Sequence, residues 1–218
     1  KKIYDSRMKA TDEVLRIFEA VSKKPTILVN ASAIGIYPPS EQATYTEKSS
    51  SRGSDFLAKT VEEWEKKASQ AEQYGTRVAC GRFGIILGKD EGALPLMSLP
   101  YKMGVGGKVG SGNQWVSWVH VSDVAKAVLY AIENDDFKGP FNVTSPDPKQ
   151  MTEFGKILGE VLHRPHWLPV PSFALKLALG DKSQLVLEGQ RVMPEKLLTH
   201  GFKFTYPDLQ KALKNIYA

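Results

Sequence analysis

The sequence predicts an α/β protein: a doubly wound parallel sheet followed by a small, mainly helical C-terminal lobe. Three observations lead to this fold class. Helical and strand-like segments alternate along the first part of the 218-residue chain. The strand-like segments are apolar throughout, as in parallel strands covered on both faces. From residue 151 onward, helices and a proline-rich connector replace the strands, so we divide the chain into residues 1–150 and 151–218.

The first elements follow from hydrophobic spacing and from helix-end signals. Apolar residues recur at helical spacing through residues 1–22, which predicts a helix. Pro25–Tyr37 is apolar and ends in small residues, so we expect a strand that is buried on both faces. Residues 55–74 form a helical pattern, with Ser54 or Asp55 as N-terminal cap and Gly75 as stop.

Strands and helices continue to alternate up to residue 146, and mainly helices follow. In order, we expect a strand over 76–88, a helix over 120–134, a strand over 139–146, helices over 151–163 and 172–180 around a connector, and a final helix. Ser122 or Asp123 lies near the first turn of the helix over 120–134, where short polar side chains cap helices.

The charge and composition are those of an ordinary globular protein, and they bear on whether its partner is a nucleic acid or a small molecule. The chain is 42% hydrophobic and 24% charged, with a net charge of +5. Its lysines alternate with acidic residues along helices and form no basic stripe with aromatic residues, so we expect no nucleic-acid partner. The positive charge mildly favours an anionic small-molecule ligand.

The single cysteine, the hydropathy and the histidine positions indicate a cytoplasmic protein without a metal. Cys80 has no partner for an internal disulfide, which favours a reducing compartment. No run of about 18 apolar residues and no apolar leader occurs, so we expect neither a membrane partner nor secretion. The four histidines are dispersed and share no cysteine or acidic cluster, so no metal site is expected.

The stretch "GVGGKVGSGNQWVSWVHVSD" resembles a phosphate cradle, but its context differs from one. In a Walker loop, Gly-Lys is followed by Ser or Thr; here Gly107-Lys108 is followed by Val109. A dinucleotide turn follows a strand and opens a helix, and this loop does neither. One alternative is a flexible surface loop. We favour a loop that approaches a ligand closely, with Trp115 and Trp118 as walls.

Five segments follow one another in a recognisable order: "NASAIGIYP", "DFLAKTVEEWEKKA", "RVACGRFGIILG", "GVGGKVGSGNQWVSWVHVSDVAKA" and "GPFNVTSPDP". In this order they resemble the extended short-chain dehydrogenases/reductases, and more narrowly the atypical branch labelled epimerase family, or nucleoside-diphosphate-sugar epimerase of the SulA type. "LHRP" and "LEGQRVMPEKLLTHGFKFTYPDLQKAL" are similar to that branch's small C-terminal domain of unknown function. The resemblance extends over essentially the whole chain.

The resemblance implies an NADP(H) cofactor held by a Rossmann-like domain. In that family a preceding stretch holds the first strands and the glycine turn, which places the cofactor pyrophosphate at a helix N-terminus. That stretch is not represented here, and the chain begins without Met in a helical pattern. We therefore expect the second half of the doubly wound sheet, and poor cofactor binding unless the missing segment is supplied.

The family's Ser, Tyr and Lys catalytic set is only partly matched. Ser32 is the candidate serine, although the usual spacing from the following tyrosine falls on Ala33; Ser32 is equally well read as a small residue at a strand end. Phe56 occupies the tyrosine position and Thr60 the lysine position. Lys59 is one residue out of step, and it is either a contact to the cofactor ribose or a solvated lysine.

Two other residues are candidate proton donors. Tyr37 follows the first strand at its carboxyl end, where open α/β sheets bind ligands. His120 lies beside the glycine loop at the start of a helix, where it is either a proton donor or an orienting hydrogen-bond partner.

The resemblance also implies contacts to cofactor and substrate. The cofactor set is Arg7, Ala31, Ser32, Ala33, Lys59, Gly84, Ile85 and Ile86. In this set Arg7 would face the extra phosphate of NADP, although a surface arginine is the plain alternative. The substrate set is Leu94, Met97, Gln114, Trp115 and Trp118.

The expected function is an NADP-dependent oxidoreductase or epimerase-like protein acting on a small molecule. The rival is a catalytically silent protein that binds NADP(H) as a sensor or scaffold, which Phe56 in place of tyrosine favours. Relatives dimerise through the two helices expected at residues 1–22 and 55–74, and whether this chain forms a homodimer is left open.

Overall fold

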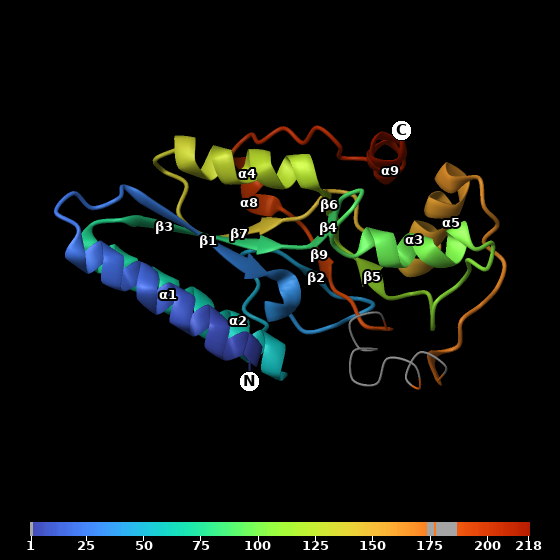
Figure 1. The fold of residues 1–218 in the computed structure, drawn as a ribbon, viewed down its shortest axis with the longest axis horizontal. Helices are drawn as coiled ribbons and strands as arrows, with labels where there is room; N and C mark the ends of the chain where they lie inside the picture. The colour runs from blue at the N-terminus through green and yellow to red at the C-terminus, as the bar shows by residue number, and fades with distance from the viewer. Residues whose placement is uncertain (1, 174–176, 178–186) are drawn as a thin grey trace.

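In the computed structural model, residues 2–173, 177 and 187–218 are described (Figure 1). The helix expected over 172–180 lies mostly outside the described residues. The main sheet has three parallel strands in the order β1-β3-β7: β1 (Ile27–Ala33), β3 (Arg77–Phe83) and β7 (Gly139–Val143). Helices α1 (Lys2–Ala20) and α2 (Phe56–Ser69) cover one face and α4 (Val121–Glu133) covers the other, so the doubly wound fold class is confirmed.

The burial of β1 differs from the sequence expectation. Five of its seven side chains are half-buried, Ala31 is exposed and Ser32 is buried. The prediction that this strand is buried on both faces is therefore wrong, and the reason is its position at the edge of the described sheet. The central strand β3 carries the fully covered pattern instead, with residues 78–82 buried.

The second expected strand is two strands separated by Gly84. After β3 the chain passes Gly84 and enters β4 (Ile85–Leu87), which pairs in parallel with β6 (Trp118–His120). A Cβ atom on Gly84 would lie 2.2 Å from the Ser117 carbonyl oxygen, so a side chain does not fit where the two segments meet.

Helix ends follow the expected signals in α2, and in α4 both Ser122 and Asp123 lie in the first turn as expected. The Asp55 carboxylate accepts a hydrogen bond from the Ala58 amide (2.7 Å), and the short 3₁₀ helix η2 (Gln70–Tyr74) ends at Gly75, whose φ is 77°. In α4 the cap is His120, one residue before the helix. Asp123 is buried and its carboxylate accepts from the Thr205 and Tyr206 amides (2.8 and 2.9 Å), which anchors the C-terminal segment.

The C-terminal lobe packs around a hydrophobic core of its own. Its helices are α3 (Leu94–Lys102), α5 (Met151–Leu162) and α9 (Leu209–Tyr217), beside the antiparallel pair β5 (Trp115–Val116) and β8 (Lys149–Gln150). Trp118, Phe154 and Leu213 lie in this core. The remaining described elements are η1 (Ile34–Ile36), β2 (Thr44–Tyr45), β9 (Arg191–Val192) and α8 (Glu195–Thr199). Because α3 shares the core with α5 and α9, the division at residue 150 stays a prediction.

Candidate functional site

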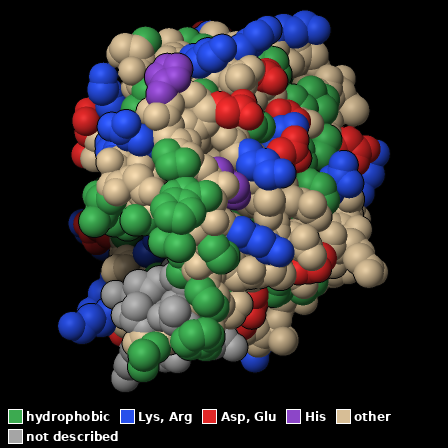
Figure 2. All heavy atoms as spheres, turned by 90° about the vertical axis from the view of Figure 1, so that its right-hand side faces the viewer, with side chains coloured by type: hydrophobic (Ala, Val, Ile, Leu, Met, Phe, Trp, Pro, Cys, Tyr) green, Lys and Arg blue, Asp and Glu red, His purple; other side chains and the backbone are tan. Residues whose placement is uncertain are grey.

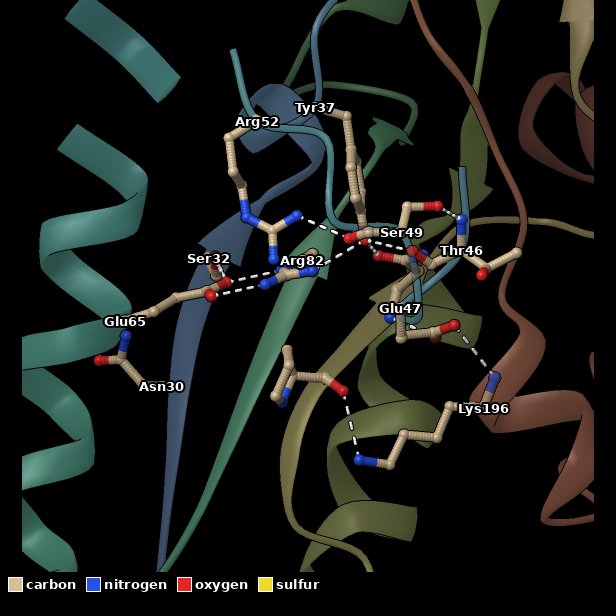
Figure 3. A network of polar contacts seen from close by, with 12 residues as sticks. Asn30, Ser32, Tyr37, Thr46, Glu47, Ser49, Arg52, Glu65, Arg82 and Lys196 are labelled. Carbon is tan, nitrogen blue, oxygen red and sulfur yellow. Dashed lines mark hydrogen bonds and ion pairs between the residues drawn. The ribbon is translucent and has the colours of Figure 1, made fainter. Parts of the chain in front are cut away.

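A buried polar network lies at the carboxyl ends of the central strands (Figure 3). Ser32 of β1 pairs in register with Arg82 of β3. The Arg82 guanidinium donates two hydrogen bonds to the Glu65 carboxylate of α2 (2.8 and 2.7 Å), and the Ser32 hydroxyl donates to the same carboxylate (2.5 Å). Arg82 is only 2% exposed, so the ion pair ties two strands and a helix together out of water.

Tyr37 closes the other side of this network. Its hydroxyl accepts a hydrogen bond from Arg82 (2.8 Å) and lies within donating distance of the Asn142 side-chain oxygen (3.0 Å) and the Thr46 carbonyl (3.1 Å). The ring is fully buried and stacks on Tyr45, with centroids 5.2 Å apart. Burial raises the pKa of the Tyr37 phenol, and the Arg82 charge opposes that rise only in part.

The network continues to the C-terminal segment through Asn142 and Glu47. The Asn142 amide and the Lys196 amide donate to the two carboxylate oxygens of Glu47 (2.8 and 3.2 Å). The Asn142 side chain also donates to the Met193 carbonyl (3.0 Å). These hydrogen bonds connect the loop at Glu47, the strand β7 and the segment at residues 193–196 at the carboxyl ends of the strands.

The sequence reasoning missed Arg82, Glu65, Asn142 and Glu47. A usable signal was present for one of them: Arg82 is a charged residue inside an apolar strand, and a buried charge needs a partner. Burial lowers the pKa of Arg82, but the hydrogen bonds and charge of Glu65 outweigh it and raise the pKa above its ordinary value. The guanidinium therefore stays charged.

The N-terminus of α2 carries no phenol and no buried lysine. Phe56 is 51% exposed at the first position of the helix. The Thr60 hydroxyl is buried and donates to the Phe56 carbonyl (2.7 Å). Lys59 lies exposed on the same turn. The residue that the family resemblance matches to the catalytic tyrosine is thus an exposed hydrophobic ring.

His120 is a buried N-cap with one nitrogen engaged. Its Nδ1 accepts a hydrogen bond from the Ser122 amide (3.1 Å) and lies 2.8 Å from the Ser122 hydroxyl. Because Nδ1 is an acceptor, the neutral ring carries its proton on the buried Nε2. Burial lowers the pKa of His120, and the Asp123 charge and a hydrogen bond with the Asn215 side chain oppose this only in part.

Of the cofactor set, Arg7 of α1 lines a hollow of about 290 Å³. This hollow lies between α1, α2 and the free edge of β1, and its lining includes Leu28, Asn30 and Trp64. The Arg7 guanidinium lies 5.0 Å from the centre of a Trp64 ring, and within the described part of the chain it forms no ion pair.

The other cofactor candidates meet at one edge of the sheet. Ala31, Ser32 and Ala33 end β1 and pair with residues 81–83, directly before Gly84, Ile85 and Ile86. The two sets are brought together as expected. Gly84 has a packing reason of its own, the close approach of Ser117, and the Ser32 hydroxyl is already held by Glu65.

The substrate set divides between core and surface. Leu94 and Trp118 are fully buried in the lobe core, and the Trp118 indole donates to the Asp147 carbonyl (2.7 Å). Met97 packs against that core. Gln114 is buried and donates to the Val109 carbonyl (3.1 Å). Trp115 is half-buried; its indole donates to the Glu41 carbonyl (2.8 Å) and the Arg191 guanidinium lies over its ring at 4.7 Å.

The glycine loop approaches the protein's own connector. A Cβ atom on Gly107 would lie 2.0 Å from the Leu168 carbonyl oxygen. The Trp167 amide donates to the Gly106 carbonyl (2.9 Å), and the Val170 amide donates to the Lys108 carbonyl (2.7 Å). Gly104, Gly107 and Gly110 match a Gly-x-x-Gly-x-x-Gly spacing, yet the loop joins α3 to β5 and opens no helix. The loop therefore makes the expected close approach, but to the backbone of the connector and not to a ligand.

Metal-binding clusters and membrane-spanning helices are both missing from the described residues. Among them, no group of three or more His, Cys, Asp or Glu side chains is arranged to hold a metal ion. Within the same part of the chain, no helix combines the length and the apolar character that crossing a bilayer demands.

Comparison with known proteins places this geometry in a family. Residues 2–144 match the sequence profile of the NAD dependent epimerase/dehydratase family, and residues 170–216 match a domain of unknown function, DUF1731. The epimerase family protein YfhF of Bacillus subtilis is 50% identical over 216 residues, which is 99% of this chain and 71% of YfhF. The epimerase family protein SAR0825 of Staphylococcus aureus is 46% identical over 97% of this chain and 70% of its own length.

Two solved structures share the fold. The human epimerase family protein SDR39U1, solved with NADPH, superposes with a TM-score of 0.92 at 32% identity, covering 99% of this chain and 73% of that one. A nucleoside-diphosphate sugar epimerase from Corynebacterium glutamicum gives a TM-score of 0.79 at 30% identity, with 97% and 41% of the two chains covered. The expected Rossmann-like sheet with its small helical C-terminal region is confirmed, and the chain belongs to the NAD-dependent epimerase/dehydratase family of the short-chain dehydrogenase/reductase superfamily.

Proposed function

We propose that this protein binds NADP(H) and acts as an oxidoreductase or epimerase on a small-molecule substrate. The observation that carries the proposal is the likeness to human SDR39U1, which was solved with NADPH and superposes at a TM-score of 0.92. When bound, the nicotinamide would supply or accept a hydride. The lone buried cysteine supports a reducing, cytoplasmic setting.

The described residues fit the cofactor in part. Arg7 forms no ion pair with described residues and lines a hollow beside β1, as a ligand for the additional phosphate of NADP requires. Residues 31–33 and 84–86 meet at the carboxyl edge of the sheet, where open α/β sheets bind ligands. Because the glycine loop opens no helix, these residues offer no pyrophosphate turn of the dinucleotide type. We therefore propose that the 218-residue chain binds the cofactor weakly by itself.

A catalytically silent NADP(H)-binding sensor is the second candidate, and Phe56 favours it. A phenylalanine at the position of the family's tyrosine has no proton to transfer. Tyr37 and Ser32, two alternative hydroxyls, are both held in the Arg82–Glu65 network. His120 remains the proposed donor for the enzyme, because its Nδ1 accepts the Ser122 amide and the proton of the neutral ring therefore lies on Nε2.

Arg7→Ala tests the cofactor assignment. The experiment uses an extended chain, in which the segment that precedes the matched region of YfhF is joined to residue 1. We expect the variant to lose about tenfold or more in NADPH affinity and little in NADH affinity, since one charged hydrogen bond to phosphate is worth roughly 1.5–3 kcal/mol. Arg16→Ala is the matched control on α1, and isothermal calorimetry is the readout. Equal losses for both nucleotides would contradict the role of Arg7.

Turnover separates the enzyme from the sensor. The extended chain is assayed for NADPH oxidation on a panel of carbonyl compounds and for epimerisation of nucleotide sugars. Activity that is lost in His120→Asn, with NADPH binding retained, supports the enzyme. NADPH binding without turnover on any substrate class supports the sensor.

A homodimer through α1 and α2 is proposed from the family, and Ile3, Ile17 and Phe56 provide exposed apolar side chains there.

A further inference from the structure

Exposed apolar side chains gather on the outer side of the C-terminal lobe, and Figure 2 shows hydrophobic side chains on this face of the molecule. We call this surface the lobe patch; its members are Leu96, Leu99, Met103, Val105, Trp167 and Leu168. Three of them are more than half exposed: Leu96 (75%), Met103 (69%) and Trp167 (65%). Such large side chains in water indicate a surface that contacts something else.

The lobe patch is one continuous surface. Leu96, Leu99 and Met103 are spaced three and four residues apart and share one face of the α3 region. The Trp167 indole donates to the Gly104 carbonyl (3.0 Å), directly after Met103. The Trp167 and Leu168 amides both donate to the Gly106 carbonyl (2.9 and 3.2 Å), which holds the connector against the loop.

A basic hollow adjoins the lobe patch. Its volume is about 450 Å³, and its lining includes two cationic side chains, Lys156 and Arg164, beside the imidazoles of His163 and His166. Burial and the neighbouring Lys156 charge lower the pKa of His166, so the positive charge of the hollow comes from Lys156 and Arg164. Glu160 is the single carboxylate among the lining residues. His166 Nδ1 lies 2.8 Å from the Tyr101 hydroxyl, so the hollow is joined to α3 by a direct contact. The exposed Lys102 and Lys108 add positive charge on the side of the loop.

We propose that this face docks on the surface of an anionic phospholipid membrane. The lipid phosphate would be bound at the basic hollow, and the lobe patch would lie among the headgroups with its Trp, Leu and Met side chains. Apolar side chains next to lysine and arginine are the combination that interfacial membrane proteins use. A protein partner is less favoured because the positive rim and the net charge of +5 match an anionic surface. The proposal does not depend on the cofactor or on turnover.

Vesicle flotation tests the proposal with the 218-residue chain. Vesicles of phosphatidylglycerol mixed with phosphatidylcholine are compared with vesicles of phosphatidylcholine alone, at low and at high salt. We expect flotation with the anionic vesicles only, and a weaker association at high salt, because the Debye length shortens from about 10 Å at 0.1 M. Flotation with neither vesicle, or equally with both, would overturn the proposal.

Matched variants locate the surface. Lys156→Glu with Arg164→Glu should lower the partition coefficient about 30-fold or more, at roughly one factor of five for each positive charge removed. Lys23→Glu, in the loop after α1, with Lys66→Glu on α2 makes the same charge change elsewhere on the molecule and should reduce binding much less. Leu99→Ser with Met103→Ser should also abolish flotation, whereas Leu129→Ser with Ile132→Ser on α4 should not. Equal losses in the control pairs would refute the assignment to this face.

Trp167 supplies a readout that misfolding does not mimic. Its emission should shift to shorter wavelength on anionic vesicles, and Trp167→Phe should lose that shift while still floating. Glycerol phosphate in solution should compete only weakly with the vesicles, because it offers nothing to the lobe patch. Complete displacement by glycerol phosphate at the phosphate concentration of the vesicles would show that the hollow binds free phosphate, and would overturn the membrane proposal. Self-association that is lost in the Leu99 and Met103 variant, without flotation of the native chain, would identify a protein interface instead.

Discussion

Arg82 of β3 connects the neighbouring strand β1, helix α2 and the loop after β1 through one guanidinium. Its hydrogen bonds reach Glu65 and Tyr37, and the Ser32 hydroxyl shares the Glu65 carboxylate. A charge buried to this extent is tolerated only because its partners satisfy it. The same bonds hold Ser32 and Tyr37, two of the candidate catalytic residues, in fixed positions.

Arg82→Met should destabilise the protein strongly. Removing one partner of a buried ion pair costs about 3–5 kcal/mol, since the remaining Glu65 charge loses its compensation. Urea unfolding of the 218-residue chain measures this, and adding Glu65→Gln should recover part of the loss. Arg16→Met, which breaks an exposed pair with Glu13, is the control and should leave the midpoint almost unchanged. A small loss in Arg82→Met would contradict the structural role assigned to the network.

The sequence predicts some residues of the buried polar network but does not predict the residues to which they form hydrogen bonds. Position at a strand end identifies Ser32 and Tyr37 as candidates, and the structure brings both to the network. Glu65 and Glu47 come from a helix and a loop far from Arg82 in sequence. Contacts of this range depend on the completed packing of strands and helices, which local patterns do not encode.

Helix α4 begins with a histidine in the role that Ser, Asp or Asn usually fills. The imidazole of His120 accepts the Ser122 amide, so its Nδ1 must be unprotonated. The sequence predicts Ser122 or Asp123 near the first turn, and both lie there. Asp123 instead accepts the Thr205 and Tyr206 amides.

His120→Asn should make stability less dependent on pH in the acidic range. The pKa of His120 is lowered in the fold, so the unfolded chain binds more protons once the pH falls below about 6.5. The native protein should therefore lose stability as the pH falls below about 6.5, until His120 also takes up a proton in the fold, and it should regain that stability as the pH rises. Asparagine keeps an N-cap acceptor without titrating. Urea midpoints of both proteins across this range test the difference; parallel pH curves would exclude the contribution of His120.

The glycines of the glycine loop allow its backbone to pack directly against the backbone of the connector. Gly107→Ala should cost about 2 kcal/mol or more, because a Cβ atom there would lie 2.0 Å from the Leu168 carbonyl oxygen. Limited proteolysis should show faster cleavage of the connector over 164–171. Gly35→Ala is the control, since nothing lies within 4 Å of the position that a Cβ atom would take there. Equal stability and equal cleavage of the two variants would contradict the close packing of loop and connector.

The arrangement of the whole molecule is the part most accessible from the sequence. Apolar strands alternating with amphipathic helices identify a parallel sheet with helices on both faces, and α1, α2 and α4 lie as that pattern requires (Figure 1). The burial of β1 is not accessible in this way, because an edge strand and a central strand of a parallel sheet have the same local composition. The free edge of β1 also borders the hollow at Arg7.

Calorimetric titration of NADPH tests the proposed function of the whole molecule most directly. The 218-residue chain is 50% identical to YfhF over 216 residues. It is compared with the extended chain that carries the preceding segment of YfhF. We expect tight binding by the extended chain and much weaker binding by the 218-residue chain, because the pyrophosphate turn is supplied only in the former. Absence of binding in both would contradict the NADP(H) proposal and, with it, most of the case for an oxidoreductase.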